Sequence, residues 1–590
     1  MSTECPPARS RAPLVAGVVA PVALLGLTGK PGVWLGKSLI GAGTADMWGH
    51  AWGYWWTARA VVQGHLPFFH APVNHPDPQT WWVIDLPVAT LLAPVTHLLG
   101  AAAAYNLAFA LHAAVGAASL AALVIRRGGP GWVAGLAGVL AATSPFARGA
   151  LVSGVPEALA VLLVPLLVLL LDQALAGAHR RQLAAAAALS AVLVLDGAYS
   201  AIAGALAGAA AVGAALWSQK DRGWVLGRAA VVAAPAAIAL GGLRLALMKS
   251  KHPAMDNAQE RMVDIGAAWV LQPLSGTDLM SWSTPAQLLS SMQAEPETPH
   301  RHIVYIGVLL PVFLALAAWK HPPARRPAFI AFMAAVLALG PALYVFGTAY
   351  TPAVLPGTWL WMAGATNLYR LAGLVPVVGL LALACVRHRL MPVAMVAVAV
   401  EWLVGTPLPL QLPTTPNPAG TVENWIAEQP IEGAVIDLPF DREGSGARGP
   451  WPQRPFFLQT AHQRPIASAL YRPTEVTKHS RAISAFDRSI TRAWQQEAVP
   501  EGGAAPLRAA RIPRPLEPDQ LDGLNAKVSR VGYRWLVLDL ELVMPNQRAD
   551  ALAWVTVWLG TPELTSEDEM RLVWSIPDVA PPSGPPALRE

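Results

Sequence analysis

Charged side chains are scarce in this sequence of 590 residues. Asp, Glu, Lys and Arg make up only 13% of it, against roughly 25% in an ordinary soluble protein, whereas 54% of the residues are hydrophobic. The composition excludes an ordinary soluble globular protein and predicts an α-helical polytopic membrane protein. The formal net charge of +5 does not indicate nucleic acid as a partner, because Lys and Arg in membrane proteins chiefly record topology.

Cysteine and the common nucleotide and metal motifs are also scarce. The two cysteines, Cys5 and Cys385, lie far apart in the sequence, which argues against a disulfide framework and a thiolate metal site. The sequence contains no Gly-rich phosphate loop, no HExxH and no CxxC. An ATPase, a zinc peptidase and a dithiol redox enzyme are therefore not indicated.

Long apolar runs, by contrast, are abundant: eleven are suited to crossing a membrane, and a twelfth, 84–100, is interrupted by Pro87 and Pro94. Counting this twelfth run as a crossing would place Arg126 and Arg127 outside. Leaving it uncrossed puts these and nearly all other basic pairs in the cytoplasm, as the positive-inside rule requires. We therefore predict about eleven transmembrane helices, within runs at 12–29, 102–125, 131–147, 157–173, 183–198, 200–217, 226–247, 303–319, 327–347, 369–386 and 390–405.

This topology fixes the predicted domains. Arg9 and Arg11 favour an uncleaved first helix, with the N-terminus inside, over a cleavable signal peptide. The long loop 30–101 and everything after about residue 406 then lie outside. The predicted domains are a transmembrane domain at 1–405, a proline-rich linker at 406–420, an extracytoplasmic α/β domain at 421–578 and a disordered tail at 579–590.

The expected α/β domain rests on alternating strand and helix patterns. The buried apolar runs 433–439 and 533–542 predict strands, and the segments 421–429 and 548–559 predict helices.

The segment GTADMWGHAWGYWW, residues 43–56, opens the long outer loop. If 45–62 is helical, Asp46 and His50 lie one turn apart on one face, and the four tryptophans of this segment share the opposite face. Because tryptophan prefers the headgroup layer, we expect a helix lying on the membrane surface. Asp46 could then act as a general base or bind a divalent cation, and His50 could complete a metal site or bind phosphate. The alternative is that Asp46 only caps the helix start.

Two charged residues at other predicted outer-face ends are further candidates. Glu157 follows Pro156 at the mouth of an apolar helix, where a carboxylate is costly unless it has water or a partner. It could also simply favour the helix N-terminus. Arg370 runs against the charge bias of the outer face and could bind a phosphate in bidentate fashion, or snorkel to the headgroups.

Weaker polar groups complete the predicted outer face. Lys249 and Lys251 could meet lipid phosphate or form flexible surface. Asp196 and Tyr199 are expected to form a solvated turn, and Asp85 is expected to end the long loop without binding a ligand.

Four stretches together carry a resemblance: GTADMWGHAWGYWW, DLPVATLLAPVTHLLG, AAAAYNLAFALHAAVGAASLAALVIRRGG and AGVLAATSPFARGALVSGVPEALAVLLVPLLVLLL. Over roughly residues 12–175, and more weakly through Arg370, the sequence resembles the GT-C superfamily of membrane glycosyltransferases, with the YfhO-like bacterial group as the nearest match. The part after 421 is similar to the outer C-terminal domain only in style.

The resemblance implies a transferase that moves a sugar from a polyprenyl-phosphate donor to a glycan, lipid or protein acceptor at the outer face of the bacterial cytoplasmic membrane. Asp46 matches the first-loop catalytic acid, Glu157 the second acidic position, and Arg370 a donor-phosphate contact. A divalent cation held by Asp46, His50 and Glu157 fits the same picture. The single acid before Met47, where many relatives carry a pair, leaves a non-catalytic scaffold open, and a lipid or glycan transporter is the other alternative.

Overall fold

The computed structural model describes most of the chain. These described residues are 10–43, 45–68, 71–75, 85–177, 180–219, 221–249, 305–340, 343–345, 348–350, 355–362, 368–386, 388–406, 408–438, 454–468, 525–526, 528–543 and 545–578. The chain divides into two compact units. The helical unit comprises Met1–Ala42, Ile84–Lys249 and Ala254–Pro416, and the mixed unit comprises Gly43–Val83, Ser250–Pro253 and Asn417–Glu590.

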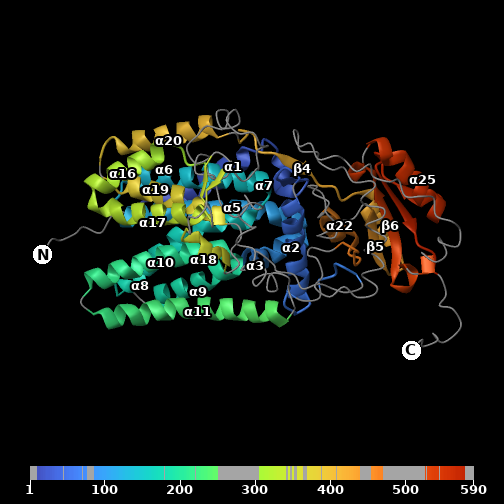
Figure 1. Cartoon of the computed structure of the whole chain (residues 1–590), viewed down its shortest axis with the longest axis horizontal. Helices are drawn as coiled ribbons and strands as arrows, with labels where there is room; N and C mark the ends of the chain where they lie inside the picture. Colours follow the sequence, from blue (N-terminus) through green and yellow to red (C-terminus); the bar gives the residue numbers. More distant parts are fainter. Residues whose placement is uncertain are drawn as a thin grey trace. The chain divides into compact units, whose positions relative to one another are not determined.

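The helical unit is a bundle whose long helices lie side by side (Figure 1). Its α-helices are α1 (Ala12–Gly26), α3 (Leu86–Leu91), α4 (Ala93–Leu99), α5 (Ala101–Arg126), α6 (Gly131–Ala142), α7 (Pro145–Ser153), α8 (Val164–Leu175), α9 (Arg180–Asp196), α10 (Ala198–Ser218), α11 (Arg222–Lys249), α16 (Leu309–Lys320), α17 (Pro322–Ala338), α18 (Gly357–Met362), α19 (Leu374–Ala384) and α20 (Met391–Gly405). Its 3-10 helices are η1 (Pro31–Leu35), η2 (Pro156–Leu163) and η4 (Leu368–Gly373). Its short strands are β1 (Ser38–Ile40), β2 (Leu343–Val345), β3 (Thr348–Tyr350) and β4 (Thr414–Pro416).

Helix α5 is the central element of this bundle and contacts α1, α6, α8 and η2. Its small residues allow close packing: a Cβ added to Gly116 would lie 2.5 Å from Leu162 Cβ and 3.0 Å from the Leu162 carbonyl oxygen. Both distances are shorter than van der Waals contact, so only glycine lets η2 approach α5 this closely. The approach fixes the position of η2, which carries Glu157.

The apolar helices agree with a membrane protein. Five are long and apolar enough to cross a bilayer, at Ala101–Arg126, Gly131–Ser153, Pro156–Leu175, Ala198–Ser218 and Arg222–Leu245. Every one of the eleven expected runs contains a helix, but the others are shorter than 18 residues, so eleven crossings stay a prediction. The run 84–100 forms α3 and α4, of six and seven residues. Each is too short to span a bilayer, which agrees with the prediction that this run does not cross.

The first part of the proline-rich segment is attached to the helical unit. Strand β4 pairs antiparallel with β1, with Leu39 opposite Thr415. Arg148 Nη2 donates hydrogen bonds to the carbonyl oxygens of Leu408 and Pro409 at 2.9 and 2.8 Å. These bonds satisfy one end of a buried guanidinium, whereas its Nε has no hydrogen-bond partner among the described residues.

The mixed unit contains a four-stranded sheet with the order β5-β6-β8-β7. Strands β5 and β6 are parallel, whereas β6–β8 and β8–β7 are antiparallel. Its elements are α2 (Ala45–Val62), α21 (Thr421–Glu428), β5 (Ala434–Leu438), α22 (Arg454–His462), β6 (Tyr533–Asp539), η5 (Leu540–Leu542), η6 (Pro545–Gln547), α25 (Arg548–Leu559), β7 (Leu564–Thr565) and β8 (Arg571–Ser575). The predicted strands and helices of this part coincide with β5, β6, α21 and α25.

The core of the mixed unit lies between the sheet and α25 (Figure 1). Apolar residues of β5, β6 and β8 pack there against Val555 and Trp558 of α25. On α21, Trp425 makes an edge-to-face contact with Trp535 of β6, with ring centroids 5.4 Å apart.

Helix α2 has the predicted bounds but not the predicted surroundings. We expected its four tryptophans to lie at the membrane surface, yet all four are buried within the protein. Trp48 contacts Phe457, and Trp52 contacts Phe456, both on α22. The indole nitrogen of Trp52 also donates to Gln459 Oε1 at 2.7 Å. The tryptophan face is therefore an interface with α22, and α2 groups with the segments after 417 instead of with the helices.

Candidate functional site

Glu157 and Arg370 form a buried ion pair in the helical unit. Arg370 Nη1 donates a hydrogen bond to Glu157 Oε1 at 2.7 Å, and the two side chains are 12% and 3% exposed respectively. Both residues were candidates from sequence, from segments 213 residues apart. The pair explains how a carboxylate is kept inside an apolar bundle, since the guanidinium compensates its charge.

Both members of the pair lie on 3-10 helices that continue directly into α-helices. Glu157 lies on η2, of eight residues, and Arg370 on η4, of six. Runs of more than three or four residues are uncommon for this helix type, which often marks functional segments. The two helices contact each other, and a Cβ added to Gly373 at the end of η4 would overlap the Phe146 ring of α7. Close packing thus holds η4, which carries Arg370, in position.

Tyr199 joins the pair from the start of α10. The guanidinium carbon of Arg370 lies over the Tyr199 ring, 5.4 Å from its centroid. A cation over an aromatic face is attracted by the electrons of the ring. A guanidinium has five N–H donors, and hydrogen bonds to Glu157 and to the Tyr369 side chain leave others for a phosphate.

A second buried polar cluster lies close by and differs from expectation. Asp85, His112 and Asp196 are each at most 1% exposed. His112 Nε2 lies 3.7 Å from Asp85 Oδ1 and 3.9 Å from Asp196 Oδ1. The prediction of a solvated turn at Asp196 is therefore wrong, whereas Asp85 directly precedes α3, and the expectation that it binds no ligand stays a prediction. His112 was missed, because a single histidine in an apolar run carries no motif.

The backbone holds this cluster in place. The Asp85 amide donates to the Asp196 carbonyl oxygen at 2.9 Å, which brings the start of α3 to the end of α9. Asp85 adopts the left-handed region, with φ +64°, a conformation that non-glycine residues maintain only when the surroundings enforce it. Helix α9 also contacts η2, and the Glu157 carboxylate is near enough to Asp196 to repel it. The two clusters are thus neighbours.

The remaining candidates are placed elsewhere in the chain. Asp46 is exposed and His50 half-buried, one turn apart on α2 of the mixed unit. The joint metal site of these two with Glu157 stays a prediction. Lys249 ends α11 with a side chain outside the described residues, and Lys251 also lies outside them. Their binding of substrate stays a prediction too.

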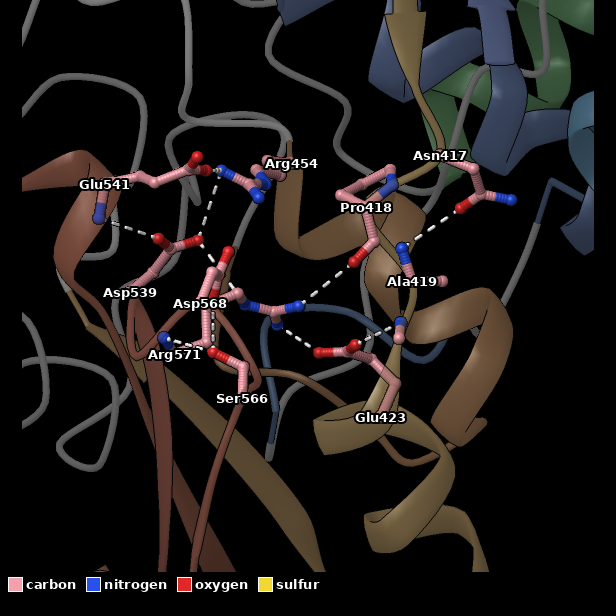
Figure 2. Close-up of polar contacts among 11 residues, drawn as sticks. Asn417, Pro418, Ala419, Glu423, Arg454, Asp539, Glu541, Ser566, Asp568 and Arg571 are labelled. Carbon is pink, nitrogen blue, oxygen red and sulfur yellow. Dashed lines mark hydrogen bonds and ion pairs between the residues drawn. The ribbon is translucent and has the colours of Figure 1, made fainter. Parts of the chain in front are cut away.

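The mixed unit contains a buried network of its own, which Figure 2 shows. Arg571 on β8 pairs with Glu423 of α21 and lies 3.6 Å from Asp539 of β6. Arg454 of α22 also contacts Asp539, at 3.4 Å, and pairs with Glu541. No sequence motif indicates this network, because its members come from five elements that meet only in the folded chain.

Two titratable groups beside this network have strongly shifted pKa values. Burial raises the pKa of Asp437 to about 7, and although Arg571 counteracts this shift, Glu423 and Asp539 reinforce it. Burial also lowers the pKa of His462 to about 3, with Arg571 and Arg464 adding positive charge nearby. Both groups are therefore held in their neutral forms over part of the pH range.

Comparison with known proteins supports the membrane assignment. The family model described as 6-pyruvoyl-tetrahydropterin synthase related domain, a membrane protein, matches residues 90–285. This range contains His112, Glu157 and Asp196. No curated protein matches the chain.

Two solved structures of the arabinofuranosyltransferase AftD from Mycobacteria are similar to this chain. The R1389S mutant, class 2, has a TM-score of 0.50 and 18% identity, covering 92% of this chain and 38% of that one. The other structure has a TM-score of 0.50 and 16% identity, covering 97% and 40%. The chain thus spans about two fifths of the length of these structures. The likeness concerns the fold alone: the chain is a membrane protein whose fold is similar to that of these two structures.

Proposed function

We propose that this protein is a membrane glycosyltransferase of the bacterial cytoplasmic membrane. It would transfer a sugar from a polyprenyl-phosphate donor to a hydroxyl of a glycan, lipid or protein acceptor at the outer face. The observation that carries the proposal is the buried Glu157–Arg370 pair, located in a helical unit with the fold of a membrane glycosyltransferase. The N-terminus would lie inside, and residues after 421 outside, as the positive-inside rule predicts.

Arg370 would bind the donor phosphate in this reaction. Negative charge builds on the phosphate as the bond between sugar C1 and the phosphate oxygen breaks, and a fixed guanidinium stabilises that charge. Glu157 would orient the guanidinium through the 2.7 Å hydrogen bond, and the Tyr199 ring would restrict its movement from the side. Lys249 and Lys251 would add attraction for the lipid phosphate.

Asp46 would act as the general base. Its carboxylate would take the proton of the acceptor hydroxyl while the hydroxyl oxygen attacks sugar C1 and the lipid phosphate leaves, so that configuration at C1 inverts. Its exposure on α2 leaves it open to an acceptor. His50, one turn away, would bind phosphate or share a divalent cation with Asp46 and Glu157.

A transfer assay with two variants tests the proposal. The purified protein in lipid nanodiscs would be given radiolabelled polyprenyl-phosphate sugars, arabinofuranose among them, with membrane glycan acceptors. We expect Arg370→Ala and Asp46→Asn each to reduce transfer by roughly 100-fold or more, the usual contribution of such groups. Arg127→Ala is the matched control, because Arg127 also pairs with a carboxylate, Asp172, at 3.1 Å in the same unit. Transfer at the unmutated rate in both variants would refute the proposed roles.

A non-catalytic scaffold is the second candidate. The observation that favours it is the burial of the ion pair itself, since buried ion pairs also occur in proteins where their role is only structural. A scaffold would show no transfer with any donor, while removal of the gene would still alter the surface glycans.

A further inference from the structure

His112 presents an unpartnered nitrogen to two buried carboxyl groups. Its Nδ1 lies 3.0 Å from the Ala108 carbonyl oxygen, an acceptor only, so Nδ1 carries the proton of the neutral ring. Nε2 then presents its lone pair to Asp85 and Asp196, and it has no hydrogen-bond partner among the described residues. An imidazole oriented through Nδ1 by a backbone carbonyl is the usual arrangement of a metal-binding histidine.

The distances from His112 to the two carboxyl groups suit a shared ion better than hydrogen bonds. The Nε2 to oxygen distances of 3.7 and 3.9 Å are too long for hydrogen bonds. Two ligands about 2.1 Å from one ion, at a tetrahedral angle, lie roughly 3.4 Å apart. One ligand atom from each of the three residues lies within 4.8 Å of the others, so a small adjustment brings all three to one ion.

The burial of the two carboxyl groups also favours a bound cation. The carboxyl groups of Asp85 and Asp196, each at 0% exposure, are joined by a side-chain hydrogen bond in an apolar bundle, and buried charges generally are paired or bind a metal. A divalent cation would compensate both carboxylates at once. We propose that Asp85, His112 and Asp196 bind one divalent cation. The mixed nitrogen and oxygen ligands favour Mn²⁺ or Zn²⁺ over Ca²⁺ or Mg²⁺, which prefer oxygen alone.

This site differs from the one expected from sequence at Asp46, His50 and Glu157. It lies next to the Glu157–Arg370 pair, because α9 ends at Asp196 and Tyr199 of α10 contacts Arg370. A cation there would add positive charge near the proposed phosphate site. The binding itself requires no sugar donor, so it is tested independently of the proposed transferase.

Manganese binding to the full-length protein provides the test. The protein in detergent would be stripped with EDTA and titrated with MnCl₂, and free Mn²⁺ would be followed by electron paramagnetic resonance. We expect one Mn²⁺ per chain, with a nitrogen coupling from the imidazole in the pulsed spectrum. His112→Gln should remove that coupling, and His112→Gln and Asp196→Asn should each weaken binding by more than the roughly 10- to 100-fold typical of an outer-shell change.

One variant is the control. Asp172→Asn removes a partly buried carboxylate of α8 that pairs with Arg127, and it should bind Mn²⁺ like the unmutated protein. The proposal is overturned if the unmutated protein binds neither Mn²⁺ nor Zn²⁺, which would indicate a proton shared among the three groups. Binding of Mn²⁺ to the unmutated protein without nitrogen coupling would overturn it as well. This result does not depend on whether the variants fold.

Discussion

Arg370 donates a hydrogen bond from Nη1 to Glu157 Oε1 at 2.7 Å, linking two 3-10 helices inside the helical unit. Neither charge is accessible enough to be compensated by water alone, so each depends on the other. Because of this mutual dependence, comparing a variant of one residue with a variant of both can distinguish the contribution of the pair to stability from its contribution to sugar transfer.

We predict that Glu157→Gln destabilises the helical unit by about 3–5 kcal/mol, because it leaves the Arg370 guanidinium buried without a counter-charge. The double variant Glu157→Gln with Arg370→Met removes both charges, so the helical unit should regain most of the lost stability. Sugar transfer should still be lost in this variant, because Arg370 is absent. Thermal unfolding of the purified protein in detergent measures the stability, and the transfer assay measures the function. If the double variant is as unstable as Glu157→Gln, the two residues are not coupled.

The sequence could predict these two residues separately but not their contact. Glu157 was a candidate because a carboxylate at the end of an apolar run is costly without water or a partner, and Arg370 because it runs against the charge bias of the outer face. The contact depends on where η2 and η4 lie. Gly116 lets η2 approach α5 and Gly373 lets η4 approach Phe146 of α7, yet both look in the sequence like any other glycine of an apolar helix.

The same limit explains the errors at Asp196 and the tryptophans. Asp196 lies in a turn by sequence, and only the fold brings it to Asp85 and His112. The bounds of α2 followed from its helical pattern, whereas the partner of its aromatic face did not. An aromatic stripe fits a headgroup layer and another helix equally well, and α22 lies about 400 residues further along the chain.

The burial of α2 against α22 leads to a second prediction. Trp52→Phe keeps an aromatic ring but removes the donor to Gln459 Oε1, leaving a buried acceptor without that bond. We expect the mixed unit to lose about 1–3 kcal/mol, seen as faster hydrogen exchange in peptides of α22. Trp48→Phe is the control, because the Trp48 indole nitrogen has no hydrogen-bond partner among the described residues. Equal losses in both variants would contradict the role assigned to this hydrogen bond.

Arg571 provides a third prediction. Arg571→Met would leave the buried carboxylates of Glu423 and Asp539 without the cation that both contact (Figure 2). The expected loss is about 3–5 kcal/mol of the stability of the mixed unit, measured by hydrogen exchange in peptides of β6. Arg534→Met serves as the control, since its partner Asp578 is 75% exposed and a pair of this kind contributes only about 0–1 kcal/mol. Comparable losses from the two variants would mean that the buried network has no special importance.

The final prediction concerns pH and two groups that act in opposite directions. The pKa of Asp437 is raised from 3.8 to about 7, so the folded state holds its proton more tightly than the unfolded chain. This stabilisation is complete below about pH 4 and is lost as the pH rises to about 7. The pKa of His462 is lowered from 6.5 to about 3, so its contribution is complete above pH 6.5 and is lost as the pH falls towards 3.

Between about pH 4 and 6.5 the two contributions therefore oppose each other, and removing either group should expose the slope of the other. Relative to the unmutated protein, Asp437→Asn should make the stability of the mixed unit fall more steeply as the pH decreases through this window. His462→Gln should do the reverse, because the proton on Asp437 then gains stability as the pH decreases without an opposing histidine. Hydrogen exchange in peptides of β5 and β6, corrected for the intrinsic pH dependence of exchange, measures both slopes. Other carboxylates contribute a background common to all three proteins, so the differences isolate these two groups, and slopes that change in the same direction would contradict the assignment.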